Sequence, residues 1–168
     1  VMSSAGPEEI PLRNPYAGSP TYNCFGCSPD NPIGLRLAFN KRGAEVTSTW
    51  NPRSDLEGYP GVVHGGIQAT LCDETAEWLI HAVLGTSGVT TELHTSYLKP
   101  ARTSDAPFDI TARLIESGDR DASIEVTICG ASGTEFTRAR LEFRIFPEEM
   151  ARRRFGFPGS EAFFPAGE

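Results

Sequence analysis

The chain has 168 residues, of which 39% are hydrophobic and 22% charged, with a net charge of −7 from 15 basic and 22 acidic side chains. This composition predicts one globular domain of ordinary size and excludes a disordered, collagen-like or coiled-coil chain. The acidic balance disfavours nucleic acid as a partner, and no run approaches the roughly 20 apolar residues that a membrane-spanning helix needs.

Residues 1–34 are predicted to form an irregular arm, because prolines at positions 7, 11, 15, 20, 29 and 32 interrupt regular structure. Cys24 and Cys27 have the Cys-x-x-Cys spacing of half a zinc site or of a redox pair. A zinc site needs two further ligands, and the sequence holds no second ligand pair at a suitable spacing. We therefore expect no metal, and we expect these cysteines to pack the arm near the mouth of a ligand pocket.

Two further features of the chain concern its compartment. The first residues lack the basic and apolar regions of a secretory signal, and a chain of this size does not need its four cysteines as disulfides. Both features predict a cytoplasmic protein.

Residues 35–146 carry clear hydrophobic periodicity. Strands are expected at 35–40 and 44–50, followed by one long helix over about 66–84, where Ile67, Leu71, Thr75, Trp78 and Ala82 share a face. Four strand-like runs follow the helix, at about 89–98, 108–114, 124–128 and 139–145. Turn residues at 117–119 and 130–133 separate the last three runs.

This order of elements predicts an α+β fold, in which an antiparallel sheet curls around one central helix. Unpaired sheet edges and leftover apolar faces favour association with a second copy of the chain. Residues 147–168 are predicted to be a second irregular segment, in which Phe155, Phe157, Phe163 and Phe164 are suited to dock on the body of the chain or on a partner subunit.

The most informative segment for function is His64-Gly65-Gly66, at the start of the predicted helix. The first turn of a helix has backbone N–H groups without internal partners and is the positive end of the helix dipole, so it can stabilise a developing oxyanion. Asp73 lies about two turns further on, away from the apolar stripe. Glu74 points another 100° around the helix, so Asp73 or Glu74, but not both, is expected to act on one substrate.

Three motifs of the chain resemble the hotdog-fold thioesterases of the phenylacetic-acid-degradation type. They are His64-Gly65-Gly66 with Thr70-Leu71-Cys72-Asp73-Glu74, a Cys-Phe-Gly-Cys lead-in at 24–27 in a segment ending at Leu35, and the run from Thr90 to Arg102. Together they span roughly residues 22–146. The resemblance implies a hotdog fold, a domain over 35–146, a homodimer or homotetramer, and hydrolysis of an acyl-CoA or similar acyl thioester without a cofactor.

The resemblance also implies roles for individual residues. Asp73 matches the general base or nucleophile, and Gly66 matches the residue whose N–H polarises the thioester carbonyl. His64 and Gly65 match residues that line the same pocket. Thr90 matches a Ser or Thr that orients the attacking water or the carboxylate, and it is expected to face Asp73 from the partner subunit. The motif register selects Asp73 over its neighbour Glu74, which is kept as a substrate-binding residue.

Basic side chains near the predicted pocket are candidates for holding the phosphates of coenzyme A, because Arg and Lys suit phosphate groups. The candidates are Lys99, Arg102 and the run Arg152-Arg153-Arg154. Two other functions stay open: a non-catalytic module that binds an acyl thioester, and a hotdog dehydratase or hydratase. Asp73 two turns into the helix favours the thioesterase.

Overall fold

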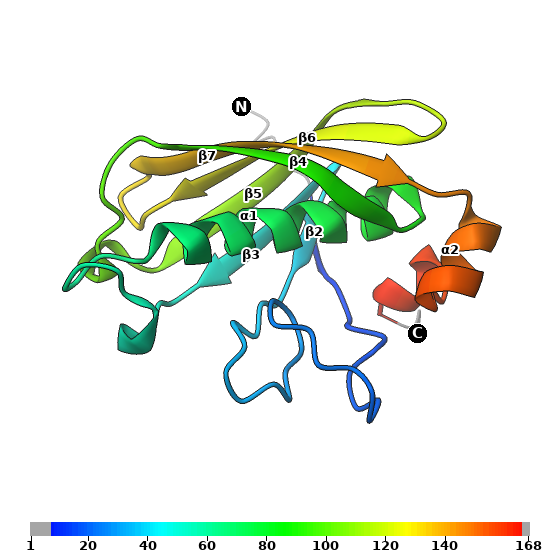
Figure 1. Cartoon of the computed structure of the whole chain (residues 1–168), viewed down its shortest axis with the longest axis horizontal. Coiled ribbons are helices and arrows are strands. Elements are labelled where there is room, and N and C mark those ends of the chain that lie inside the picture. The colour runs from blue at the N-terminus through cyan, green and yellow to red at the C-terminus, as the bar shows by residue number, and fades with distance from the viewer. Residues whose placement is uncertain (1–7, 166–168) are drawn as a thin grey trace, which may run out of the picture.

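The computed structural model describes residues 8–165 as a curved antiparallel sheet with a long helix, α1 (Gly65–Leu79), along one face (Figure 1). The sheet has seven strands in the order β1-β2-β3-β5-β6-β7-β4, so β1 and β4 are its edges. The strands are β1 (Glu9–Pro11), β2 (Asn40–Arg42), β3 (Glu45–Trp50), β4 (Gly88–Tyr97), β5 (Phe108–Ser117), β6 (Asp121–Cys129) and β7 (Glu135–Ile145). The other helical segments are α2 (Glu148–Phe155), η1 (Ser54–Leu56), η2 (Ile80–Leu84), η3 (Thr103–Asp105) and η4 (Ser160–Phe163). This architecture confirms the predicted α+β hotdog fold.

The central strands form because their apolar residues alternate with polar ones. In β6, Ile124, Val126 and Ile128 are buried, while the residues between them are only partly buried. β5 and β7 flank β6 on both sides, each antiparallel to it. The predicted strands at 44–50, 89–98, 108–114, 124–128 and 139–145 are all confirmed.

Helix α1 confirms the predicted long helix, with one difference at its end. Leu71, Thr75 and Trp78 are buried along one face, as their spacing indicated. After Leu79 the backbone widens into the π-helical turn η2, and the segment ends at Gly85, whose φ of 70° lies in the left-handed region that favours glycine.

Residues 35–39 do not form the predicted strand. The alternating apolar side chains are buried, but their backbone bonds to the N-terminal loop instead of the sheet. The Leu35 N–H donates to the Phe25 carbonyl at 2.7 Å, and the Leu37 N–H donates to the Gly26 carbonyl at 2.9 Å. Between them Arg36 has a φ of 56°, which breaks the extended conformation.

The terminal segments cover the side of α1 that lies opposite β7 (Figure 1). Residues 147–168 were expected to be irregular; within the described part this is wrong, because they form α2 and η4. The docking of phenylalanines on the chain's own body is confirmed for Phe163, which is fully buried and packs edge-on against Trp78 with ring centroids 5.4 Å apart. The Arg13 N–H donates to the Phe163 carbonyl at 2.7 Å, so the two terminal segments also bond to each other.

Strand β4 is paired on one side only, with β7, and most of its length is exposed. Its apolar side chains Val89, Leu93 and Tyr97 are 40%, 37% and 52% exposed. Among the helices of residues 8–165, none has both the length and the apolarity to cross a bilayer.

Candidate active site

The start of helix α1 is capped by His64. The Gly66 N–H donates to His64 Nδ1 at 2.9 Å, and because a backbone N–H can only donate, Nδ1 is the unprotonated ring nitrogen. Space at this turn is tight, since a Cβ on Gly66 would lie 3.2 Å from His64 Nδ1. Gly66, the oxyanion donor implied by the resemblance, is therefore engaged by His64 in this structure. Within residues 8–165, the Gly65 N–H has no such acceptor.

A groove of about 580 Å³ opens beside this helix start. His64, Gly65, Tyr97 and Lys99 line it, so the structure brings two pocket residues and one basic candidate together. Arg102 is exposed and does not line the groove, and its backbone N–H donates to the Asp105 carboxylate at 3.2 Å.

Asp73, about two turns further along α1, forms a polar contact with Thr90 of β4. The Thr90 hydroxyl donates to Asp73 Oδ1 at 2.6 Å. Gly66, Thr70 and Asp73 follow one another at helical spacing, so Asp73 lies on the same face as the first turn of α1. A carboxylate held by a hydroxyl on an open surface can accept a proton from water or attack a carbonyl carbon.

The expectation that Thr90 faces Asp73 from a partner subunit is wrong for this pair, because both residues belong to one chain. The chain turns sharply after η2, and β4 then runs back along α1. The register of β4 against β7 shifts between Thr90 and Glu92, so a bulge lies at the point where the strand meets Asp73.

Tyr97 is a site residue for which the sequence analysis assigned no role. Its hydroxyl donates to the Gly65 carbonyl at 2.8 Å, which ties the far end of β4 to the start of α1. The sequence feature that could have indicated Tyr97 is its position at the end of the alternating strand, just before Lys99-Pro100, where the chain leaves the strand. β4 therefore contacts α1 at both Asp73 and Gly65.

Glu74 lies on a different side of α1 from the Thr90 contact. Both of its carboxylate oxygens are 3.5 Å from Cys24 Sγ in the N-terminal loop. Burial raises the pKa of Glu74 to about 7, and the neighbouring Cys24 adds to this effect. The hydrogen bond with Cys27 lowers the pKa of the Cys24 thiol to about 5. Glu74, predicted to bind substrate, is therefore placed with the cysteines rather than in the groove beside His64.

Two further titratable groups follow along this side of α1. Burial raises the pKa of Glu77 to about 8 and lowers the pKa of His81 to about 4, so the pair is neutral at pH 7. His81 Nδ1 lies 2.9 Å from the Thr86 carbonyl, and because a carbonyl only accepts, Nδ1 carries the proton.

The basic run Arg152-Arg153-Arg154 lies in α2, at the opposite end of α1 from Gly65 (Figure 1). Arg152 is bonded within its own segment, to Glu148 at 2.7 Å and to the Pro158 carbonyl at 2.7 Å. The structure does not bring this run to the groove.

Comparison with known proteins agrees with the fold. The family model described as the thioesterase superfamily matches residues 60–137, which include α1 and β4. An uncharacterised protein of Schizosaccharomyces pombe is 37% identical over 94 residues, or 55% of this chain, and the matched part is 49% of the relative, so the chain spans about half of that relative's length.

Two solved structures show the same fold at low identity. A thioesterase superfamily protein is 24% identical, with a TM-score of 0.66 over 72% of this chain and 62% of its own. A protein of Streptococcus mutans, solved with bound acetyl-CoA, is 23% identical, with a TM-score of 0.57 over 62% of this chain and 83% of its own. The chain therefore has the hotdog fold, and its residues 60–137 match the thioesterase superfamily.

Proposed function

We propose that the chain hydrolyses an acyl thioester of coenzyme A or of a similar thiol carrier, with Asp73 as general base or nucleophile. The observation that carries the proposal is the 2.6 Å hydrogen bond from Thr90 to Asp73, which fixes a carboxylate on the same helix face as a capped, glycine-rich helix start. Thioester hydrolysis needs both an activated attacking oxygen and a donor for the developing oxyanion.

The Gly65 N–H is the better placed donor for this oxyanion. It belongs to the first turn of α1, where N–H groups point along the helix axis away from the helix, and no acceptor in the described part of the chain engages it. The Gly66 N–H instead donates to His64, whose ring thereby holds the helix start in one conformation. His64 is thus a positioning residue in this proposal.

Distance along the helix favours an active site shared between two chains. Gly65 and Asp73 are eight residues apart, which is about 12 Å along the axis at 1.5 Å per residue. The carbonyl oxygen and the attacked carbon of a thioester are only about 1.2 Å apart. Asp73 of one chain is therefore paired in this proposal with the helix start of a second copy.

The exposed edge of β4 is the surface that suits such pairing. It presents unpaired backbone groups, and the strand contacts Asp73 through the Thr90 hydroxyl and Gly65 through the Tyr97 hydroxyl. Two copies joined at this edge by a two-fold axis would bring each Asp73 toward the partner's helix start.

The reaction in the general-base form balances without a further reactant. Asp73 accepts a proton from water as the water oxygen bonds to the thioester carbonyl carbon, and the oxyanion is held by backbone N–H groups. The tetrahedral intermediate then collapses, the C–S bond breaks, and the thiolate takes the proton back from Asp73. The products are a free acid and a thiol.

Two observations support coenzyme A as the thiol. Lys99 lines the groove beside Gly65 and is suited to a phosphate group, and the Streptococcus mutans protein of the same fold binds acetyl-CoA.

The test is thiol release from a panel of acyl-CoAs, aromatic and aliphatic, short and long, by the native chain and by Asp73→Asn. General acid–base catalysis contributes about 10²–10⁴-fold, so we expect the variant to lose at least 100-fold in kcat. Asp109→Asn is the matched control, because Asp109 accepts a hydrogen bond from the Thr49 hydroxyl at 2.7 Å on the sheet, away from α1. The control is expected to retain full turnover.

Equal turnover by Asp73→Asn and the native chain would exclude the assigned base. If the folded native chain cleaves no member of the panel but binds a non-hydrolysable acyl-CoA thioether in calorimetry, the chain is a binding module and the proposal is wrong.

A further inference from the structure

A second group of chemically reactive side chains lies outside the proposed active site. Cys24 and Cys27 come from the N-terminal loop and Glu74 from α1, and one ligand atom of each lies within 4.8 Å of the other two. Cys24 Sγ is 3.5 Å from both carboxylate oxygens of Glu74. All four cysteines of the chain are free thiols, so the pair is available for binding.

The separation of 3.5 Å between Cys24 Sγ and the Glu74 carboxylate oxygens matches the donor spacing of a tetrahedral zinc site. Zn–S bonds of about 2.3 Å and Zn–O bonds of about 2.1 Å, at the tetrahedral angle, place a sulfur and an oxygen roughly 3.6 Å apart. Two thiolates with one carboxylate are also a donor set that suits Zn²⁺ and not Mg²⁺ or Ca²⁺, which require oxygen ligands. The fold thus supplies from α1 the third ligand that the sequence spacing did not reveal.

The loop holds the two cysteines in this arrangement through its own hydrogen bonds. The Cys27 N–H points to Cys24 Sγ at 3.5 Å, and the Tyr22 hydroxyl lies 2.8 Å from Cys27 Sγ. The Asn14 side chain donates to the Cys27 carbonyl at 3.0 Å. Such outer contacts orient metal ligands and stabilise thiolates.

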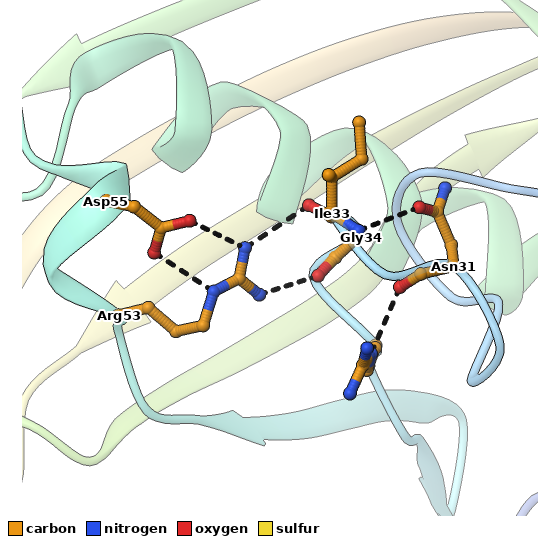
Figure 2. Close-up of polar contacts among 6 residues, drawn as sticks. Asn31, Ile33, Gly34, Arg53 and Asp55 are labelled. Carbon is orange, nitrogen blue, oxygen red and sulfur yellow. Dashed lines mark hydrogen bonds and ion pairs between the residues drawn. The ribbon is translucent and has the colours of Figure 1, made fainter.

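The far end of the loop is anchored to the body of the chain (Figure 2). Arg53 donates to the Gly34 carbonyl at 2.7 Å and to the Ile33 carbonyl at 3.2 Å, while it also bonds to Asp55. Asn31 donates back to the Cys24 carbonyl at 3.4 Å. The cysteine pair therefore sits on a braced loop.

Close approach of the loop to α1 depends on the residue between the cysteines. A Cβ at Gly26 would lie only 2.3 Å from Glu74 Oε2, so no other residue fits here without displacing the carboxylate. The glycine lets the loop backbone press against Glu74, which brings the three ligand atoms together.

Within the described part of the chain, the absence of a basic side chain beside the Glu74 carboxylate also favours a bound cation. A cavity of about 330 Å³ adjoins them, lined further by Tyr16 and Glu77, and no Lys or Arg lines it. Glu74 has no ion pair with a basic residue anywhere in residues 8–165. The ionised form of a partly buried Glu74 carboxylate beside two thiols is unfavourable unless a positive charge compensates it.

We propose that Cys24, Cys27 and Glu74 bind one Zn²⁺ ion, whose fourth position is open to the adjoining cavity and is taken by water or another small ligand. An open position of this kind distinguishes the site from a closed structural site with four protein ligands. The ion ties the N-terminal loop to α1 at the residue next to Asp73. The proposal does not rest on thioester hydrolysis.

The test titrates the full chain, treated with chelator and reductant, after a thiol dye has confirmed four free thiols. Zn²⁺ is followed by calorimetry, and Co²⁺ by absorption, where a thiolate-to-cobalt charge-transfer band with strong visible bands marks tetrahedral sulfur ligation. We expect one equivalent of either ion per chain. Cys24→Ser and Glu74→Gln are expected to weaken Zn²⁺ at least tenfold, whereas Cys129→Ser, a thiol on β6 outside the cluster, leaves the affinity unchanged.

Two results would overturn the proposal. One is a folded, fully reduced chain that takes up no stoichiometric Zn²⁺ or shows no thiolate band with Co²⁺. The other is a Glu74→Gln variant that binds Zn²⁺ as tightly as the native chain; this variant keeps both thiols, so it decides the question even if Cys24→Ser fails to fold.

Discussion

The hydrogen bond between Thr90 and Asp73 makes a quantitative prediction for the variant Thr90→Val, which keeps the shape of the side chain and removes the hydroxyl. The bond is 2.6 Å long and joins a neutral donor to a carboxylate. Hydrogen bonds to charged groups contribute about 1.5–3 kcal/mol, and each 1.4 kcal/mol corresponds to about tenfold in rate. Because Thr90 is exposed and water competes for the carboxylate, we expect the lower end of this range, or about a tenfold loss of kcat with little change in KM.

The assay is steady-state thiol release from the best acyl-CoA of the panel, with Thr90→Ser as the conservative variant. Serine retains the hydroxyl, so we expect its kcat to stay within about threefold of the native value. Thr49→Val removes the equivalent hydroxyl from the Asp109 pair on the sheet and is expected to leave turnover unchanged. An unchanged kcat in Thr90→Val, or an equal loss in Thr90→Ser, would refute the reasoning that this hydroxyl orients the carboxylate.

Two further predictions concern stability, both measured by urea unfolding. Phe163→Ala removes a fully buried ring that packs against Trp78 and His81, and it is expected to lower the free energy of unfolding by about 3–5 kcal/mol. The control Phe155→Ala removes a ring that is 42% exposed and should cost no more than about 1 kcal/mol. Similar losses in both variants would contradict the docking of this segment. The variant Glu77→Gln should become more stable relative to the native chain as pH rises. The pKa of the Glu77 carboxyl is about 8 in the folded chain and 4.5 in the unfolded chain, so ionisation of this carboxyl destabilises the native fold progressively as pH rises from 4.5 to 8. Its side chain is 35% exposed, so we expect about 2 kcal/mol at pH 8.5 with chelator present, and a pH-independent difference would contradict the assignment.

The sequence predicted most of the sheet and the central helix because their periodicity reflects burial directly. β6 is an example, since Ile124, Val126 and Ile128 alternate with polar residues and are buried in the structure. The same rule failed at residues 35–39, where alternation is equally clear. There the side chains are buried but the backbone partners are in the loop around Phe25, and side-chain spacing does not say where backbone hydrogen bonds go.

The C-terminal helix was missed for a local reason. In α2 the residues Glu148 and Glu149 begin the helix and Arg152 lies near its end, an order that suits the helix dipole and gives an ion pair between Arg152 and Glu148. The charged residues of this helix form no apolar stripe that would have predicted it. The flanking Pro147 and Gly156 are typical of loops, although here they are the N-cap and C-cap of the helix.

The candidate site was predictable as a set of residues but not as an arrangement. Local motifs singled out His64, Asp73 and Thr90, yet only the path of β4 along α1 shows that Thr90 reaches Asp73 within one chain. The contact of Glu74 with Cys24 spans 50 positions of sequence, and no spacing rule covers such a distance.

Successive residues of α1 direct two different chemistries, because side chains one position apart point about 100° apart around a helix. Asp73 therefore faces β4 and Thr90, while Glu74 faces the loop that carries Cys24. A cation held by Glu74 and the loop would restrain the rotation of α1 about its axis, and the same rotation sets the direction of the Asp73 carboxylate toward Thr90. The two sites are thus expected to be coupled through the rigidity of one helical turn rather than through any shared ligand.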